Sequence, residues 1–582
     1  MRWAGRISVQ IPAGFLVSSM EVPRSTGAPP MGWAWLLWVS VVVVTLAICY
    51  TAFTGHIWED YLITFRFSRN WARGDGLVYL VGERIHGFTS FLNVMIPAVA
   101  DWLYGGESIM PALTVYRAAC IAALAVATMV LGGLLRFDPA VPRWAVWILP
   151  LVVGADFKTI AYACNGQETA FVWLFTALAM WSLRSSPASG WAGFGLAGAG
   201  LMYSRPDGFV FAGILGIAAI VWPRGGRAEI WALCKAGLLA TACYAPWLAW
   251  VWSYYGTPVP HTIVAKAGAY GEPTKLSGFG GAVIRVTTAA LRDASEVFAP
   301  IYANDADWPG WMRPLCLILA GAAVLPLLLP SSPLVARRAA SAFVLAIAYL
   351  VMIHLRIGIL FPWYTTFAAL VGMVSLVSMT SWVVARSRSV LAAGSIAAVS
   401  MLPLFGMVVL SVHGWRQIAL QQREIEWGVR ASIGQWLARH VAPGERVLLE
   451  PIGYIGFFSN AALYDYPGLV SPRMVAVRRA GHKGLTGAAV ALEPEWLVLR
   501  RHEAVDAAQV AAIREHYNVA YEIDVTPRLR QFLRADPHYG TGYLAMDCHF
   551  IVFRRNERSE RPLETGDSTI SEPGTAAGSP PG

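Results

Sequence analysis

Long apolar runs, each close to the length of a membrane-crossing helix, dominate the first 412 residues. A bilayer core of about 30 Å needs roughly 20 apolar residues per helix. Strong runs lie at 33–53, 110–135, 144–162, 170–183, 230–252, 311–329, 339–355, 357–380 and 389–412, and shorter ones lie at 191–203 and 209–222. The two shorter runs flank the polar break "SRPDG". The pattern predicts about eleven transmembrane helices.

After residue 412 the pattern changes to short strand-like runs that alternate with helical ones. "RVLLE" (446–450) and "WLVLR" (496–500) favour strands, whereas "EWGVRASIGQWLARH" and "VDAAQVAAIREHYN" favour helices. The predicted fold class is therefore a mainly α polytopic membrane protein with a C-terminal extracytoplasmic α/β domain. The expected divisions are a cytoplasmic segment 1–32, a transmembrane domain 33–412 with outer loops 54–109 and 253–310, the α/β domain 413–555, and a disordered tail 556–582.

Composition agrees with a membrane protein. The chain has 582 residues, of which 56% are hydrophobic and 14% charged, against about 25% charged in an ordinary soluble domain. Its 25 tryptophans suit the water–lipid boundary, and the net charge of +9 requires no nucleic acid partner. The seven cysteines show neither a disulfide framework nor the spacing of a zinc or iron–sulfur site.

Arginines indicate which loops face the cytoplasm, because Lys and Arg beside spans stay on that side. They cluster in five connecting loops, at 136 and 143, 184, 224 and 227, 337 and 338, and 386 and 388. By alternation, "CNGQET" (164–169), "SRPDG" (204–208), the loop 253–310 and the junction 354–356 face outward. An odd number of spans also puts the C-terminal domain outside.

The segment 88–103 does not fit this count. It is short and contains Asp101. As a full span it would put residues 59 and 60 on the face opposite the later outer loops. We therefore predict a re-entrant or interfacial segment, which is tolerated where it lines a protein cavity.

Polar residues gather on the predicted outer side. Glu59 and Asp60 open the first outer loop, at the start of a helix expected to lie on the membrane surface. The two adjacent acids could instead simply stabilise a helix N-terminus. Each of the other polar residues could likewise form an ordinary ion pair or hydrogen bond and have no role in a binding site. Together, carboxylates, cations and aromatic rings suit a site for a lipid phosphate. The other members of the set are Glu83, Arg84, His86, Thr89, Asn165, Glu168, Arg205, Asp207, His261, Thr262, Lys266, His354, Arg356, Trp363 and Tyr364.

A resemblance to a known family rests on five stretches that occur in this order: "WEDYLITFRFSRNWARGDGLVY", "GERIHGFTSFL", "NGQETA", "SRPDG" and "YYGTPVPHTIVAK". The chain resembles the GT-C glycosyltransferases that use polyprenyl-phosphate sugars, and most of all the bacterial arabinofuranosyltransferase B group. The resemblance implies a multi-pass enzyme of the bacterial inner membrane with an extracytoplasmic active site. It further implies inverting transfer of a sugar to a cell-envelope glycan or glycolipid, with a carboxylate general base.

Carried over by position, the resemblance assigns roles to individual residues. The catalytic acids fall on Asp60, expected to be the base, and Glu59. The family's "G-x-E" turn falls on Gly166 and Glu168, its "RPDG" on 205–208, and its loop lysine on Lys266. From the chemistry of the outer residues, donor phosphate binding is expected of Arg205, Lys266, Arg356 and His261, and substrate binding of Glu168, Asp207, Asn165 and Tyr61. Tyr61 directly follows the acids, where relatives have a small residue first, and His261 stands where relatives often carry Asn. A divalent cation could be recruited by the acids, but no dedicated set of oxygen ligands is visible, so no cofactor is expected.

Other classes of protein share some of these features. A transporter or flippase of envelope lipid or sugar precursors also places charges at broken helices, but transporters usually show paired internal repeats, which the sequence lacks. A lipid-phosphate phosphotransferase would need a firm metal site. A non-catalytic assembly protein would not need eleven spans.

Overall fold

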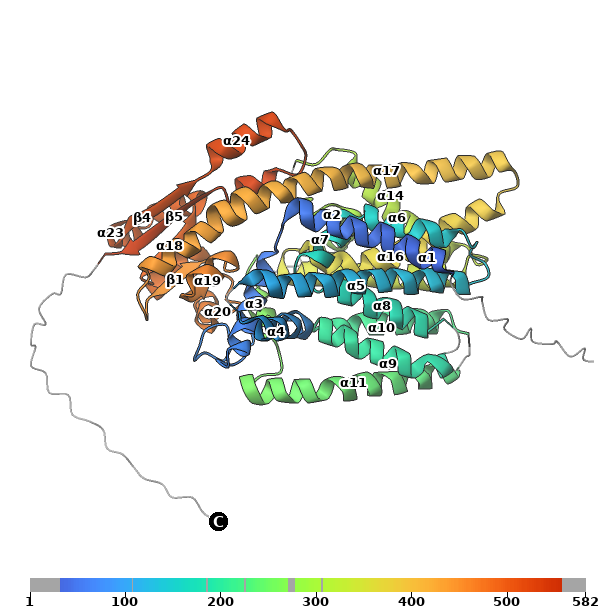
Figure 1. The fold of residues 1–582 in the computed structure, drawn as a ribbon, viewed down its shortest axis with the longest axis horizontal. Helices are drawn as coiled ribbons and strands as arrows, with labels where there is room; N and C mark the ends of the chain where they lie inside the picture. The colour runs from blue at the N-terminus through green and yellow to red at the C-terminus, as the bar shows by residue number, and fades with distance from the viewer. Residues whose placement is uncertain are drawn as a thin grey trace, which may run out of the picture.

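The computed structural model describes residues 32–556, except 107, 185–186, 225–226, 271–277 and 305–306. Apolar helices form an elongated bundle, and a small sheet domain lies at one end of it (Figure 1). Nearly all of the predicted cytoplasmic segment 1–32 and tail 556–582 fall outside the described residues.

The bundle is built from helices that follow the predicted apolar runs closely. Its first helix, Trp33 to Thr54, contains a π-helical turn between α1 and α2. The helices are α1 (Trp33–Val39), η1 (Ser40–Val44), α2 (Thr45–Thr54), α5 (Ile109–Phe137), α6 (Ala145–Ala155), α7 (Phe157–Cys164), α8 (Thr169–Ser182), α9 (Pro187–Ser204), α10 (Gly208–Val221), α11 (Arg227–Tyr255), α14 (Met312–Val324), η2 (Leu325–Leu328), α15 (Leu334–Ile357), η3 (Pro362–Thr365), α16 (Thr366–Arg386) and α17 (Val390–Leu420).

By length and composition, six of the described helices could cross a membrane. The number becomes seven if α6 and α7, which are bent by 72°, count as one span. The sequence predicted one span over 144–162, and the two helices together pass for one span that is broken at Asp156. The bend has a local cause, because the Asp156 side chain accepts a hydrogen bond from the backbone N–H of Thr159 at 3.1 Å and starts a new helix. Several remaining apolar helices are shorter than 18 residues, so the count of eleven stays a prediction.

The arginine-containing connections and the predicted site lie at opposite ends of the bundle. α8 runs from Glu168 at one end to Arg184 at the other, and α10 runs from Asp207 to the turn before Arg224. α15 runs in the reverse direction, with Arg338 in its first turns. Arg184, Arg224 and Arg338 line one cavity. The segregation of charge that the sequence suggested is therefore present in the fold.

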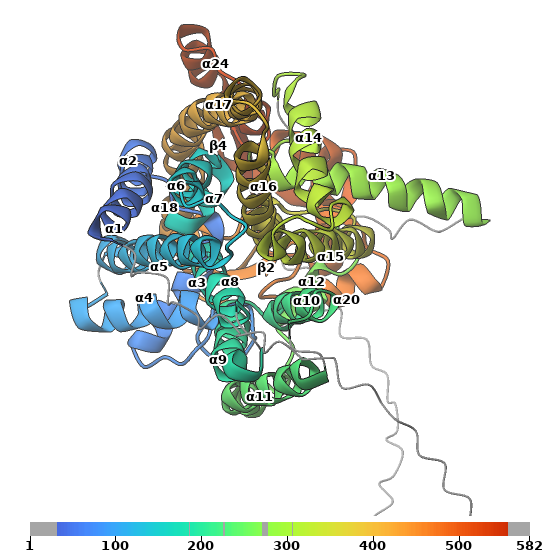
Figure 2. The ribbon, with the colours of Figure 1, turned by 90° about the vertical axis from the view of Figure 1, so that its right-hand side faces the viewer.

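Three helices near the sheet domain depart from the bundle direction or lie outside the bundle: α3 (Glu59–Ala72), α4 (Phe91–Tyr104) and α13 (Gly278–Phe298). Figure 2 shows α4 and α13 lengthwise, whereas most bundle helices are seen end-on. The direction of α4 is that expected of an interfacial or re-entrant segment. Most of α3 is buried, and Arg66 donates to the carbonyl of Gly456 at 2.8 Å, so α3 is covered by the sheet domain, and its position at the membrane surface stays a prediction.

The C-terminal part contains the α/β unit that the sequence predicted for this region. Its five strands have the order β2-β1-β3-β5-β4, in which β1 is parallel to β2 and β3 while β5 is antiparallel to β3 and β4. The strands are β1 (Arg446–Leu449), β2 (Ala462–Asp465), β3 (Trp496–Arg500), β4 (Tyr517–Asp524) and β5 (His549–Arg555). The surrounding helices are α19 (Tyr454–Ser459), α20 (Pro472–Arg479), α21 (Gly484–Leu492), α22 (Arg501–Ala508), α23 (Ala511–His516), α24 (Thr526–Ala535) and η5 (Gly542–Ala545).

Two connections fix this unit to the bundle. α17 continues through the π-helical segment η4 (Gln421–Ala431) into α18 (Ser432–His440), so one helix runs from the bundle to the sheet (Figure 1). A hydrophobic cluster is also shared, because Ile63 and Phe67 of α3 pack with Val447 of β1 and Val498 of β3. The first outer loop and the sheet thus have a common core.

Candidate functional site

A cavity lies where α3 meets the outer connections of the bundle, with about 580 Å³ of empty space that includes open solvent at its mouth. Asp60, the second residue of α3, is in its wall, and Asp60 Oδ2 accepts a hydrogen bond from Gln167 Nε2 at 3.1 Å. The polar and aromatic lining comprises Asp60, Thr64, Thr89, Asn93, Gln167, Glu168, Arg205, Thr262, Lys266, Trp363 and Tyr364. Four residues predicted from separate stretches of sequence, Asp60, Glu168, Arg205 and Lys266, therefore meet in one cavity.

Arg205 is neutralised by two carboxylates. Its Nη1 lies 2.7 Å from Glu168 Oε1, and its Nε lies 2.8 Å from Asp207 Oδ1. Burial lowers the pKa of Arg205, but Asp207 and Glu168 outweigh burial and hold the pKa well above its ordinary value. Tyr349 donates to Asp207 Oδ2 at 2.9 Å, and Asn93 Nδ2 donates to Glu168 Oε2 at 3.2 Å. The predicted "NGQE" and "SRPDG" motifs form one hydrogen-bonded ion cluster at the side of the cavity.

Lys266 supplies a second cation with a different environment. It ends α12 (His261–Lys266), and its Nζ lies 5.0 Å from the ring centre of Phe361 and 5.4 Å from that of Trp363. Such contacts stabilise an ammonium group without neutralising its charge. The adjoining loop is held by the sheet domain, because Tyr466 donates to the carbonyl of Ala269 at 2.9 Å. Lys266 can therefore attract an anion within the cavity.

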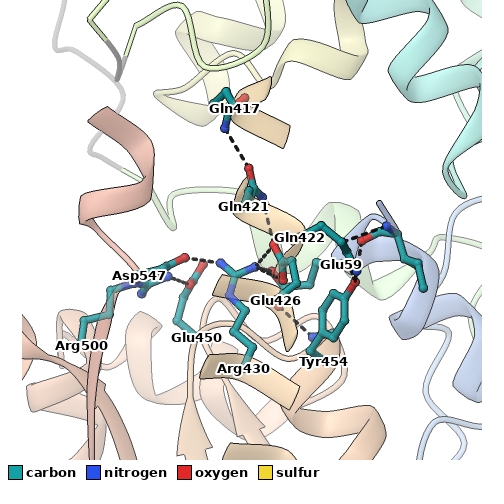
Figure 3. Close-up of polar contacts among 12 residues, drawn as sticks. Glu59, Gln417, Gln421, Gln422, Glu426, Arg430, Glu450, Tyr454, Arg500 and Asp547 are labelled. Carbon is teal, nitrogen blue, oxygen red and sulfur yellow. Dashed lines mark hydrogen bonds and ion pairs between the residues drawn. The ribbon is translucent and has the colours of Figure 1, made fainter. Parts of the chain in front are cut away.

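Glu59 points to the sheet domain and is absent from the cavity lining. Its Oε1 accepts the backbone N–H of Gly453 at 2.8 Å, and its Oε2 lies 3.0 Å from Arg430 Nη1. Figure 3 shows that Arg430 also contacts Glu426 and Asp547, and that Arg500 continues the network. Burial raises the pKa of Glu59 to about 8, although Arg430 lowers it. Its position suits a connection between domains better than proton transfer.

Besides Glu59, five predicted residues lie outside the cavity lining: Asp207, which is paired with Arg205, and Tyr61, Asn165, His261 and Arg356. Tyr61 is buried and stacks on Phe65, with ring centres 5.5 Å apart. Asn165 accepts the backbone N–H of Trp58 at 3.0 Å through its carbonyl and so supports the segment before α3. The backbone N–H of His261 donates to His86 at 2.8 Å, and Arg356 is exposed in the last turn of α15.

Sequence reasoning missed Gln167 and Asn93. Gln167 lies inside the quoted motif "NGQE", but only the folded chain shows that it bonds to Asp60. Asn93 is a polar residue in the first turn of an apolar helix, and its Oδ1 accepts from Tyr116 while its amide group donates to Glu168. A buried amide in an apolar helix needs partners, and this was the available signal.

Metal-binding geometry is not evident in the part of the chain that the structure describes. Within those residues, no group of three or more His, Cys, Asp or Glu side chains is placed to hold a metal ion. Glu168 and Asp207 are paired with Arg205, and Glu59 with Arg430. These partners occupy the oxygen atoms that a hard divalent cation would need.

Comparison with known proteins gives one sequence relative. The chain is 27% identical over 248 residues to the terminal β-(1→2)-arabinofuranosyltransferase of Mycobacterium tuberculosis. The match spans 40% of this chain and 38% of that protein, so the chain covers less than half of the relative. A domain family described only as being of unknown function, DUF8728, matches residues 416–543.

Solved structures show likeness in fold. The apo crystal structure of the Archaeoglobus fulgidus oligosaccharyltransferase aligns with a TM-score of 0.52 at 12% identity, covering 85% of this chain and 74% of that one. The crystal structure of ArnT from Cupriavidus metallidurans bound to undecaprenyl phosphate aligns with a TM-score of 0.49 at 11% identity, covering 91% of this chain and 99% of that one. At 12% identity the likeness to the oligosaccharyltransferase concerns the fold alone.

Proposed function

Because the chain has the GT-C glycosyltransferase fold and is related to an arabinofuranosyltransferase, we propose that it is a membrane glycosyltransferase. It transfers a sugar, arabinofuranose being the one the relation favours, from a polyprenyl-phosphate donor to a cell-envelope glycan or glycolipid. One observation carries the proposal. Asp60 shares a cavity with Lys266, a cation whose described neighbours are aromatic rings, while the nearby carboxylates are paired with Arg205.

Asp60 acts as the general base. It takes the proton from an acceptor hydroxyl while that oxygen forms a bond to the anomeric carbon of the donor sugar. The bond between the anomeric carbon and the phosphate oxygen breaks, and its electron pair leaves with the polyprenyl phosphate. Attack opposite the leaving group inverts the configuration. Gln167 orients the Asp60 carboxylate through its 3.1 Å hydrogen bond.

Lys266 binds the phosphate of the donor and stabilises the charge that develops on it as the sugar departs. Arg205 has a different role, because its two carboxylate partners leave little net charge for a phosphate. It fixes Glu168, which is in the cavity lining and can accept hydrogen bonds from sugar hydroxyls. Trp363 and Tyr364 add flat surfaces in the same lining on which a sugar ring can lie.

The arginine-containing connections face the cytoplasm under the positive-inside rule. The cavity and the sheet domain then face the cell exterior. This orientation supports transfer at the outer face of a bacterial inner membrane.

The test is the Asp60→Asn variant, assayed with a polyprenyl-phosphate arabinofuranose donor. Asparagine keeps an oxygen acceptor for Gln167 Nε2, so the variant should fold and insert. Removing a general base should lower kcat by about 10²–10⁴-fold. Asp75→Asn is the matched control, because Asp75 is an exposed acid of the same outer loop. Full activity of Asp60→Asn would exclude Asp60 as the base, and lipid translocation without glycosidic product would favour the transporter class.

A further inference from the structure

A second pocket, with about 480 Å³ of empty space that includes open solvent at its mouth, lies at the opposite end of the bundle. It is formed by the ends of α5, α8, α10 and α15. Its apolar lining consists of Leu134, Phe137, Met180, Leu183, Leu215, Ala218, Leu334 and Val335. The remaining lining residues are Asp138, Arg184, Arg224 and Arg338, so three cations and one carboxylate share an otherwise apolar space.

Two of the cations lie against the same aromatic ring. The guanidinium carbons of Arg184 and Arg224 are 5.6 Å and 5.8 Å from the ring centre of Phe137. Arg184 Nη1 donates to the carbonyl of Trp181 at 2.8 Å, and Arg224 Nη1 donates to the carbonyl of Arg184. A guanidinium has five N–H groups, so after these described hydrogen bonds Arg184 and Arg224 each have further N–H donors for a ligand.

The acidic side chain in the lining does not neutralise this pair. Asp138 accepts backbone N–H groups through both oxygens, from Ala140 at 3.0 Å and from Val335 at 2.9 Å. Arg338 has a structural role, because it donates to the carbonyls of Leu183 and Trp222 at the ends of α8 and α10. Glu229, outside the lining, accepts the backbone N–H of Arg224 at 2.7 Å and lies 4.0 Å from Arg338 Nη2. Among the described ion pairs none joins a carboxylate to the guanidinium of Arg184 or Arg224, so these two like charges lie beside the apolar lining.

Such a pair suits an anion, and planar guanidinium forks match the oxygens of a phosphate. The apolar lining suits a hydrocarbon chain rather than a hydrated ion. The cavity also lies at the arginine-rich end of the bundle, and the cytoplasmic leaflet is rich in anionic lipid. We propose that this cavity binds an anionic phospholipid, with its phosphate held by Arg184 and Arg224 and an acyl chain on the apolar lining.

The proposal is tested by ligand-dependent thermal unfolding of the full chain after delipidation in detergent. The probes are dioctanoyl phosphatidylglycerol, dioctanoyl phosphatidylcholine and glycerol 3-phosphate. We expect a saturable rise in Tm with phosphatidylglycerol, because a ligand that binds only the folded state stabilises it. An equal rise with phosphatidylcholine would overturn the requirement for negative charge. An equal rise with glycerol 3-phosphate would overturn the assignment to a lipid.

The double variant Arg184→Ala/Arg224→Ala should need at least about tenfold more phosphatidylglycerol for half of the Tm shift, since two charge-assisted hydrogen-bonding groups are lost. Arg386→Ala is the matched control, because Arg386 lies at the same end but is not in the cavity lining. An unchanged half-saturation in the double variant would overturn the proposal. If that variant does not fold, native mass spectrometry of the wild type decides, and failure to retain phosphatidylglycerol over phosphatidylcholine would contradict the inference.

Discussion

The backbone N–H of Gly453 donates to Glu59 Oε1 at 2.8 Å, and this contact joins the sheet domain to the residue next to Asp60. The approach is so close that a Cβ atom at position 453 would lie 2.0 Å from Glu59 Cγ. Real Cβ atoms do not make such contacts. The start of α3, and with it the cavity wall that contains Asp60, is therefore positioned by a segment from the far end of the chain.

Gly453→Ala should displace Glu59 and destabilise the protein by about 1–3 kcal/mol, the usual cost of forcing an extra carbon into a packed interior. Thermal or denaturant unfolding measures the change. Gly310→Ala is the control, because a Cβ at Gly310 meets no atom within 4 Å. Equal stability of the two variants would contradict the prediction, because the contact between position 453 and Glu59 would then accept the extra methyl group at no cost in the free energy of unfolding.

Glu59 predicts a pH dependence of stability. Its pKa rises from an ordinary value of 4.5 to about 8 in the folded state, chiefly through burial. The folded state then binds the proton more tightly than the unfolded state, so this contribution is complete below pH 4.5 and is lost as the pH rises through 8. Glu59→Gln is neutral throughout and keeps an oxygen for Gly453. Between about pH 6 and pH 9 its Tm should fall less than that of the wild type; parallel Tm curves would refute the prediction.

Lys266→Ala should impair use of the donor. Loss of a cation–phosphate interaction of about 1.5–3 kcal/mol corresponds to a rise in KM for the donor of about 10-fold to 100-fold, with a smaller change for the acceptor. Arg356→Ala is the informative comparison, because the sequence assigned it the same role but the structure leaves it exposed outside the cavity. An equal rise in the donor KM of both variants would show that Arg356 contributes to donor binding as much as Lys266 does.

Chelation by EDTA should leave transfer activity unchanged. Glu168 and Asp207 are already paired with Arg205, so a divalent cation would have to displace an existing ion pair. Steady-state transfer after dialysis against EDTA measures the effect. Loss of activity that Mg²⁺, Mn²⁺ or Ca²⁺ restores would show that Asp60 recruits a metal in the presence of substrate.

Local sequence predicted much of the fold. The apolar run 110–135 became α5 (Ile109–Phe137), and the polar stretch from Glu59 became α3, because helix length and periodicity are local properties. The bend at Asp156 was also signalled locally, by an acid within an apolar run. The run 144–162 was counted as one span, and its length alone does not show the break.

Partners distant in the chain could not be predicted in this way. Asp60 and Glu59 are neighbours in sequence, yet one faces the cavity and the other faces Arg430. Successive residues of a helix point about 100° apart, so which of the two faces the cavity depends on how α3 is rotated under the sheet. That rotation is set by the shared cluster of Ile63 and Phe67 with β1 and β3, which no local pattern contains.

The uninterrupted helix through α17, η4 and α18 limits how the molecule can move. A helix without a flexible linker transmits rotation and tilt from one end to the other. The sheet domain therefore cannot swing as a separate lid over the membrane half. The long helix therefore keeps the sheet domain aligned with the end of the bundle where the cavity that contains Asp60 lies.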